Sequence, residues 1–321
     1  MTERRSLTLV IAAFDEADSL PLLQPRLAAA LDAMEDIDGR NLYVDDGSRD
    51  ATWDVMRAIA AADPRVALLR LARNFGKEPA LTAGLDHVDT DAAIVLDADG
   101  QDPPELVPRF VAKWREGFDV VYGTRSRRVG ESWLKRFTAA AFYRVMNHLS
   151  DVPVPPDTGD FRLVSRRVLD ALRQMRERQR FMKGLFAWVG FPQVAIAYER
   201  EPRIAGRTKF DYWRLWNLAL EGITSFSTLP LRVATYAGVV AALAAFAWGA
   251  WIITRTLLWS DPVQGWPSLM TVVLFLGGIQ LMALGIVGEY LGRTYLEVKR
   301  RPLYLVAETS APGSMIGPSV D

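Results

Sequence analysis

The sequence contains no cysteine among its 321 residues and only two histidines, His87 and His148. The absence of cysteine excludes disulfide bridges, thiolate metal sites and cysteine nucleophiles. Two histidines are too few for a histidine-rich zinc site. Any bound metal must therefore be held by carboxylates, a ligand set that favours Mg²⁺ or Mn²⁺.

The sequence also lacks a net charge, with 38 basic and 38 acidic residues. Their distribution is uneven, because residues 1–122 hold 13 Lys/Arg against 23 Asp/Glu, whereas residues 123–214 hold 19 against 9. Neither a GxGxxG nor a Walker lysine motif occurs, so a dinucleotide cofactor and P-loop chemistry are not indicated. An acidic, a basic and an apolar part follow one another along the chain.

Two long uncharged segments lie near the C-terminus, at residues 234–254 and 267–288. At about 1.5 Å per residue each forms a helix of roughly 31–33 Å, which crosses the ~30 Å hydrocarbon core of a bilayer. The alternative, a pair of buried core helices, seldom stays free of charge for so long. We therefore expect two C-terminal transmembrane helices.

Positive charges flank these segments on the outer sides and are scarce between them. The flanks carry Arg214, Arg232, Arg293, Lys299, Arg300 and Arg301, whereas the connecting turn holds only Arg255 beside Asp261. The positive-inside rule then places both termini and the large N-terminal domain in the cytoplasm. We expect a multi-pass membrane protein.

Residues 1–124 alternate between apolar runs and helical stretches. Strands are predicted at residues 7–13, 41–44, 66–71, 92–96 and 120–123, and helices at residues 20–34, 51–61, 78–87 and 104–116. This order predicts an α/β domain with a mainly parallel sheet and helices on both faces. Ligands of such sheets bind beyond the carboxyl ends of the strands.

Acidic pairs follow three of these strands: Asp15 and Glu16, Asp45 and Asp46, and Asp97 and Asp99. One such pair could cap the next helix, but three at the same sheet edge indicate a site for a cation or for hydroxyl groups. Asp97 and Asp99 project to the same side of an extended segment, so they can hold one metal, or a metal and a sugar. A polar turn that ends a strand is the alternative.

A series of short motifs extends over nearly the whole chain. It comprises FDE (14–16), DDGS (45–48), NFGKE (74–78), DAD (97–99) with QDPPE (101–105), TGDFR (158–162), RFMKG (180–184), LALEGITSFSTLP (218–230) and EVK (297–299). In this order the motifs resemble family 2 nucleotide-sugar glycosyltransferases, and within them the bactoprenol glucosyltransferases. Dolichol-phosphate mannose synthases are more distant relatives.

The resemblance implies a GT-A-type domain that inverts the sugar configuration while transferring glucose from UDP-glucose to undecaprenyl phosphate. The chain then divides into a cytoplasmic catalytic domain (1–210), an interfacial helical segment (211–232), a two-helix membrane region (233–290) and a cytoplasmic tail (291–321). The resemblance also implies the bacterial cytoplasmic membrane and a homo-oligomer, a tetramer among relatives. Five positions depart from the usual family pattern: Ala12 (proline), Asp15 (asparagine), Gly100 (leucine), Thr208 (serine) and Phe210 (tyrosine or tryptophan).

The chemistry of the donor explains the residue types in these motifs. Negative charge builds on the departing diphosphate, so a divalent cation and cationic side chains are expected to face it. The predicted donor site comprises Phe14, Asp15, Glu16, Asp45, Asp46, Lys77, Asp97, Ala98, Asp99, Gln101, Arg203 and Lys209, with Asp97 and Asp99 on the metal and Asp99 also catalytic. Asp45 and Asp46 suit ribose and uracil, or alternatively cap a turn.

Lys77 begins a predicted helix, a poor position for a cation relative to the helix dipole. An interaction with the donor or with acidic neighbours would explain its position, and a solvated lysine is the alternative.

The basic middle of the chain is predicted to face lipid phosphates rather than nucleic acid. Arg125 and Arg136 flank an amphipathic stretch with aromatic residues, as in helices that lie in the membrane interface. The resemblance implies that a cationic loop around Arg203 and Arg207 closes over the two substrates, although simple lipid anchoring is the alternative. The predicted acceptor-phosphate residues are Arg125, Arg136, Arg162 and Arg207.

The resemblance puts Asp160 at the position of a candidate catalytic base. A phosphate monoester has a second pKa of about 6, so near pH 7 it is mostly a dianion and needs little deprotonation. We therefore predict that Arg125 and Arg162 hold the acceptor phosphate while Asp160 orients those cations or the sugar. A loop carboxylate paired with Arg162 for stability alone is the alternative.

Other functions fit less of the sequence. The donor sugar could instead be mannose, N-acetylhexosamine or aminoarabinose, because no short motif reports its hydroxyl contacts. A processive polysaccharide synthase would carry a QxxRW motif, but no tryptophan here follows an arginine. A nucleotide-sensing module without catalysis has no need for the motif at residues 158–162 beside a cationic loop.

Overall fold

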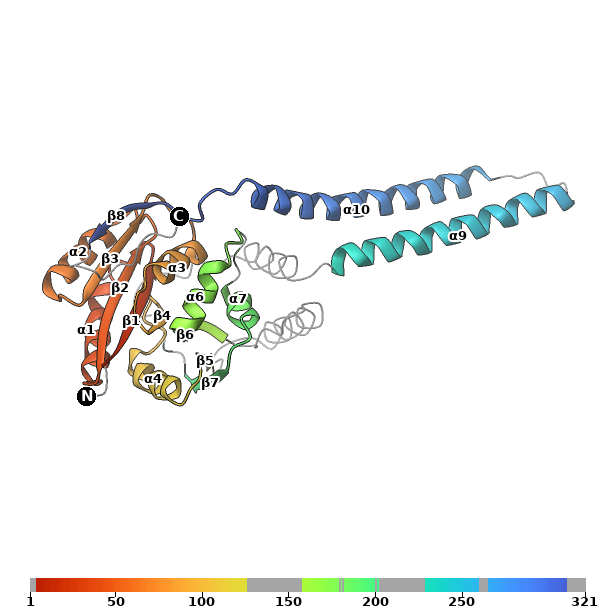
Figure 1. Ribbon diagram of the computed structural model, residues 1–321. Helices are drawn as coiled ribbons and strands as arrows, with labels where there is room; N and C mark the ends of the chain where they lie inside the picture. The colour runs from red at the N-terminus through yellow and green to blue at the C-terminus, as the bar shows by residue number, and fades with distance from the viewer. Residues whose placement is uncertain are drawn as a thin grey trace.

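The computed structural model describes residues 4–125, 158–178, 180, 182–199, 201, 229–259 and 265–310. These residues form an α/β domain from which two long helices extend side by side (Figure 1). The predicted interfacial segments around residues 127–143 and 211–228 lie outside the described residues.

The first half of the domain follows the predicted alternation closely. Its strands are β1 (Arg5–Ala13), β2 (Ile37–Asp45), β3 (Val66–Leu71) and β4 (Ala92–Asp97), and its helices are α1 (Leu20–Asp32), α2 (Thr52–Ala62) and α3 (Lys77–Asp86). The strand pairs β1–β2, β1–β4 and β2–β3 are all parallel. The predicted parallel sheet is therefore confirmed in this half.

The second half reverses one strand inside the sheet. Its elements are η1 (Pro104–Leu106), α4 (Val107–Arg115), β5 (Val120–Arg125), β6 (Thr158–Ser165), α6 (Arg166–Gln174), α7 (Met182–Trp188) and β7 (Gln193–Tyr198). The full sheet has the order β7-β5-β6-β4-β1-β2-β3-β8, and β6 runs antiparallel to both β4 and β5. Because Val95 pairs with Arg162, the start of β6 lies beside the carboxyl end of β4.

Helices cover both faces of the sheet, as predicted. The pleat of β1 sends Leu9 and Ile11 into a core with α1, α2 and α4, whereas Val10 joins a second core with α3, α6 and α7. All three β1 side chains are fully buried. Burial on both faces explains why the strands read as continuous apolar runs.

The two C-terminal helices are α9 (Leu229–Trp259) and α10 (Trp266–Val298). Their apolar windows, Ala234–Ile252 and Thr271–Val298, are not buried in the protein. Phe246 is 77% exposed and Leu281 is 71% exposed. A pair of soluble core helices would bury such side chains, so these helices are suited to association with a membrane.

The chain after α10 returns to the α/β domain, which was not predicted. Strand β8 (Val306–Ser310) pairs antiparallel with β3 at one edge of the sheet (Figure 1). Just before it, the Tyr304 hydroxyl donates to Asp86 Oδ2 at 2.9 Å. All five residues of β8 are exposed, so the strand depends on backbone pairing and leaves no apolar pattern in the sequence.

Helix α3 approaches the sheet closely because Gly84 has no side chain. A Cβ atom at Gly84 would lie 2.4 Å from Val10 Cγ1 and 3.1 Å from Val44 Cγ2. We expect Gly84→Ala to lower the free energy of unfolding by about 1–3 kcal/mol through overpacking, despite a gain of about 1 kcal/mol in helix propensity. Urea unfolding measures this change.

Adding Val10→Ala tests the cause, because it removes the methyl group that the new Cβ atom meets. The double variant should be less destabilised than the sum of the two single changes. A Gly84→Ala protein as stable as the original would contradict this packing.

Candidate active site

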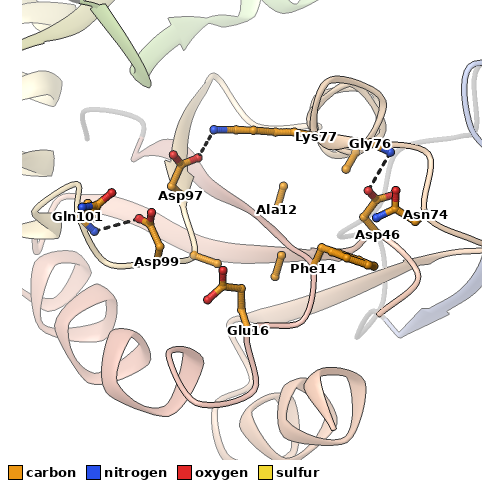
Figure 2. Close-up of a pocket in the computed structure, with 13 residues that line it drawn as sticks. Ala12, Phe14, Glu16, Asp46, Asn74, Gly76, Lys77, Asp97, Asp99 and Gln101 are labelled. Carbon is orange, nitrogen blue, oxygen red and sulfur yellow. Dashed lines mark hydrogen bonds and ion pairs between the residues drawn. The ribbon is translucent and has the colours of Figure 1, made fainter. Parts of the chain in front are cut away.

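A cavity of about 480 Å³ opens at the carboxyl ends of β1, β2 and β4. Among the described residues it is lined by Ala12, Ala13, Phe14, Glu16, Asp46, Asn74, Gly76, Lys77, Ala80, Asp97, Ala98, Asp99 and Gln101 (Figure 2). Eight of the predicted donor residues thus lie around one cavity, at the sheet edge where parallel strands place ligands.

Lys77 joins two carboxylates from different strands at this cavity. Its Nζ lies 2.6 Å from Asp97 Oδ1, at the end of β4 (Figure 2), and 2.6 Å from Asp160 Oδ2, on β6. Burial lowers the pKa of Lys77, but the charges of Asp160 and Asp97 raise it more, so its pKa lies well above the ordinary value. Acidic neighbours thus account for a lysine at the first position of α3, as one of the predicted explanations held.

Asp160 and Arg162 lie on β6 rather than in a loop. Burial raises the pKa of Asp160, but the positive charges of Lys77, Lys183 and Arg162 lower it by a larger amount. The pKa of Asp160 is therefore well below the ordinary range. Arg162 is buried, and its guanidinium lies 4.2 Å from the centre of the Phe186 ring. Burial lowers the pKa of Arg162 to about 10, so it stays charged near pH 7.

Each of these two side chains keeps one buried polar atom without a hydrogen-bond partner in the described part of the chain. The atoms are Asp160 Oδ1 and Arg162 Nε. Buried polar atoms are nearly always hydrogen-bonded, so Asp160 Oδ1 can accept, and Arg162 Nε can donate, one further hydrogen bond.

Asp97 and Asp99 bring two carboxylates, the hard oxygen ligands that a divalent cation prefers, to the cavity. Asp99 Oδ1 accepts from the Gln101 backbone N–H at 3.1 Å, and Lys77 engages Asp97 Oδ1. No group of three or more His, Cys, Asp or Glu side chains is placed to hold a metal within the described ranges. Two carboxylates fit Mg²⁺ or Mn²⁺, which commonly take their other ligands from substrate phosphates and water.

Asp46 lines the cavity while holding the loop after β3. Its Oδ1 accepts from Phe75 N at 2.7 Å. Its Oδ2 accepts from Gly76 N at 2.9 Å (Figure 2). Burial raises the pKa of Asp46 to about 6, although these two hydrogen bonds lower it. The carboxylate therefore shapes the loop that leads to Lys77.

Asp15 and Asp45 are not among the described residues that line the cavity. Asp45 is fully buried and lies 3.1 Å from Arg70 Nε. Asp15 has φ 54°, and its Oδ1 accepts from Arg49 N at 2.9 Å. This left-handed backbone is tolerated by aspartate and asparagine alike, which explains how Asp15 can replace the usual asparagine. Their predicted contacts with the donor stay predictions.

Several predicted cations lie outside the described residues, namely Arg136, Arg203, Arg207 and Lys209. The backbone of Arg125 ends β5, opposite Tyr198 of β7. The described site therefore consists of the residues around the cavity and of the Asp160–Arg162 pair.

Comparison with known proteins agrees with the motifs. Residues 8–173 match the model of glycosyl transferase family 2, and residues 229–294 match the GtrB C-terminal hairpin. The chain is 49% identical over 302 residues to an uncharacterised glycosyltransferase of Synechocystis sp., covering 94% of this chain and 95% of that protein. The chain belongs to glycosyl transferase family 2.

A second relative agrees with this membership. The glycosyltransferase is 47% identical over 300 residues to a prophage bactoprenol glucosyl transferase homologue of Escherichia coli, covering 94% of this chain and 98% of that one. A solved glucosyl-3-phosphoglycerate synthase from Mycobacterium tuberculosis, in complex with Mn²⁺, UDP-glucose and phosphoglyceric acid, is 19% identical with a TM-score of 0.44, covering 68% of this chain and 77% of that one. The family resemblance and the GT-A-like α/β class predicted from the motifs are confirmed.

Two charged residues beside the Lys77–Asp160 pair of this glycosyltransferase, Glu78 and Lys183, were not predicted from the sequence. Glu78 Oε2 accepts from Met182 N at 3.3 Å, so it joins the start of α3 to the start of α7. Burial and the charge of Asp160 raise the pKa of Glu78 to about 7, while Lys77 and Lys183 lower it. Both residues lie in motifs that were recognised, NFGKE and RFMKG, but their proximity depends on the folded chain.

The raised pKa of Glu78 predicts a pH dependence of stability. Its pKa lies above the ordinary value of 4.5, so the folded state binds the proton more tightly and the free energy of unfolding falls as pH rises from about 4.5 to 7. Glu78→Gln cannot ionise, so we expect it to gain stability relative to the original protein between pH 5 and 8. Thermal unfolding of the detergent-purified chain measures this.

Asp46→Asn is a positive control, since burial also raises the pKa of Asp46. Its stability relative to the original protein should likewise rise with pH, because the raised pKa acts in the same direction. Parallel pH curves for Glu78→Gln and the original protein would contradict the raised pKa of Glu78.

Proposed function

We propose that this glycosyltransferase transfers glucose from UDP-glucose to undecaprenyl phosphate, with inversion, at the cytoplasmic face of the membrane. The observation that carries the proposal is the pair of ion pairs made by Lys77. They join Asp97, a carboxylate suited to binding a metal, to Asp160 of the Asp160–Arg162 pair. The name of the Escherichia coli relative, a bactoprenol glucosyl transferase homologue, supports both the sugar and the lipid acceptor.

The donor would occupy the cavity. Asp97 and Asp99 would hold Mg²⁺ or Mn²⁺, which supplies charge to stabilise the departing diphosphate. Lys77 adds a cation at the same place, and Arg203 and Lys209 are proposed to contact the diphosphate as well. The other predicted donor residues that line the cavity are Phe14, Glu16, Asp46, Ala98 and Gln101.

The acceptor phosphate would lie on the other side of Lys77. Arg125 and Arg162 are proposed to hold it, together with Arg136 and Arg207, because a dianion must approach an anionic donor. A phosphate oxygen attacks the anomeric carbon, the bond from that carbon to UDP breaks, and UDP leaves with the electron pair. Inversion follows from this single displacement.

Asp160 orients groups in this scheme rather than removing a proton. Its low pKa makes it a weak base, and its Oδ2 is paired with Lys77. Its Oδ1 has no partner within the described residues and could accept a hydrogen bond from a sugar hydroxyl group. The acceptor needs little deprotonation near pH 7 because its second pKa is about 6.

A product assay tests the proposal. The purified chain is incubated with undecaprenyl phosphate, Mn²⁺ and a panel of labelled donors: UDP-glucose, UDP-N-acetylglucosamine, GDP-mannose and UDP-aminoarabinose. We expect a lipid-linked monosaccharide from UDP-glucose. A polymer would indicate a processive synthase, a different sugar would overturn the donor, and no product with any donor would overturn the enzyme assignment.

The first prediction of this proposed function concerns the metal. Asp99→Asn replaces a charged ligand with a neutral one, so we expect turnover to fall by about 10²-fold or more. The fold should be unchanged by circular dichroism. Removal of divalent cations with a chelator should also abolish activity of the original protein, and full activity in excess chelator would refute the metal assignment.

The second prediction concerns Asp160. Asp160→Asn should lower the rate substantially, because Lys77 and the substrate lose a charged partner. Since no proton is removed by Asp160 in this scheme, raising the pH from about 7 to 9 should not relieve the defect. Recovery of the rate over that range would instead identify Asp160 as a general base.

The third prediction concerns topology. The charge flanks of α9 and α10 support cytoplasmic termini and a cytoplasmic catalytic domain in a bacterial inner membrane. A reporter fused at the C-terminus should therefore read cytoplasmic, and one inserted near Ser260 should read external. A cytoplasmic signal near Ser260 would contradict two membrane-spanning helices. We also propose that the protein forms a homo-tetramer, the assembly that the resemblance implies.

A further inference from the structure

The turn after β4 carries Asp99 and Gln101 into the cavity, and it contains a glycine. Gly100 has φ 69°, in the left-handed region. Glycine adopts this conformation readily but adopts many others as well. The turn therefore depends on contacts with the rest of the protein to keep Asp99 in one place.

The end of β7 provides such contacts. The backbone N–H of Glu201 donates to Gln101 O at 3.2 Å, and Gln101 Nε2 donates to Glu201 O at 3.4 Å. The Tyr198 hydroxyl donates to Asp102 Oδ1 at 2.6 Å. Three hydrogen bonds thus hold two consecutive residues of the turn.

Tyr198 is itself held rigidly by the core. It is buried, and its ring packs edge-on against Phe161 with a centroid distance of 5.8 Å and an interplanar angle of 84°. The backbone of Gly123 also lies close to the ring, because a Cβ atom there would lie 2.6 Å from Tyr198 Cε1. Because the ring is confined in this way, its hydroxyl group fixes the position of the buried Asp102.

Arg26, on α1, binds the same region through ion pairs with partly exposed carboxylates. Its Nε and Nη2 each lie 2.8 Å from an oxygen of Glu105, just after the turn. Its Nη1 and Nη2 each lie 3.0 Å from an oxygen of Glu201. One guanidinium with two carboxylates in bidentate geometry is a specific and strong arrangement. Arg26 therefore ties the segment after the turn to the segment after β7.

We propose that Tyr198 and Arg26 are positioning residues that set the acidic turn, and thereby the affinity of the site for a divalent cation with a nucleoside diphosphate. This inference rests on the proposed role of Asp97 and Asp99 as metal ligands. Neither Tyr198 nor Arg26 is among the described residues that line the donor cavity. Tyr198 and Arg26 act on the turn through Asp102, Glu105 and Glu201. Removal of a direct partner of a metal ligand typically changes metal affinity by about 10- to 100-fold, so these residues are expected to act at the lower end of that range.

The test measures Mn²⁺ binding in the presence of UDP by electron paramagnetic resonance on the purified full chain. Tyr198→Phe removes only the hydroxyl group, and Tyr43→Phe is its control, because the buried Tyr43 hydroxyl donates to Gln24 Oε1 at the same 2.6 Å. Arg26→Gln is compared with Arg65→Gln, because Arg65 also binds two carboxylates, those of Asp32 and Asp63. The thermal midpoint of each variant is measured in parallel.

We expect Tyr198→Phe and Arg26→Gln to raise the Mn²⁺ dissociation constant by about tenfold. The two controls should leave it unchanged at a similar loss of thermal stability. Wild-type affinity in both test variants, or an equal loss in the controls, would overturn the inference. Failure of the original protein to bind Mn²⁺ with UDP would instead overturn the metal site itself.

Discussion

The site is organised around the ammonium group of Lys77, which lies between the carboxylates of Asp97 and Asp160. These carboxylates end up close together because β6 enters the sheet antiparallel to β4. Two neighbouring anions repel each other, and a cation between them offsets this repulsion. Lys77 can reach both because α3 begins at this sheet edge, and Gly84 lets that helix lie close to β1 and β2.

This arrangement has a chemical consequence for each half of the reaction. In the proposed reaction, Lys77 places a positive charge next to the carboxylates that would hold a divalent cation. The same charge keeps Asp160 ionised, since it lowers the pKa of that carboxyl group. An ionised, paired carboxylate is suited to orienting cations or hydroxyl groups and poorly suited to taking a proton. The proposed acceptor is already an anion near neutral pH, so it needs no base at this position.

Much of the fold could be predicted from the sequence, because buried strands and amphipathic helices leave local patterns. The acidic strand ends correctly indicated the edge that bears the cavity. The ion pair of Lys77 with Asp160 depends on the direction of β6, and no local pattern reports strand direction. Strand β8 is exposed and was missed for lack of an apolar pattern. Asp45 shows that a carboxylate at a strand end can turn inward to a partner such as Arg70.

The most direct test of this account is a double-mutant cycle on kcat with Lys77→Met, Asp160→Asn and the two changes combined. If Lys77 acts on the acceptor side through Asp160, the effects are coupled, and the double variant should be about as slow as the slower single variant. The account predicts this strongly non-additive result. Effects that simply multiply would show that the two residues act independently and would contradict the central role of their ion pair.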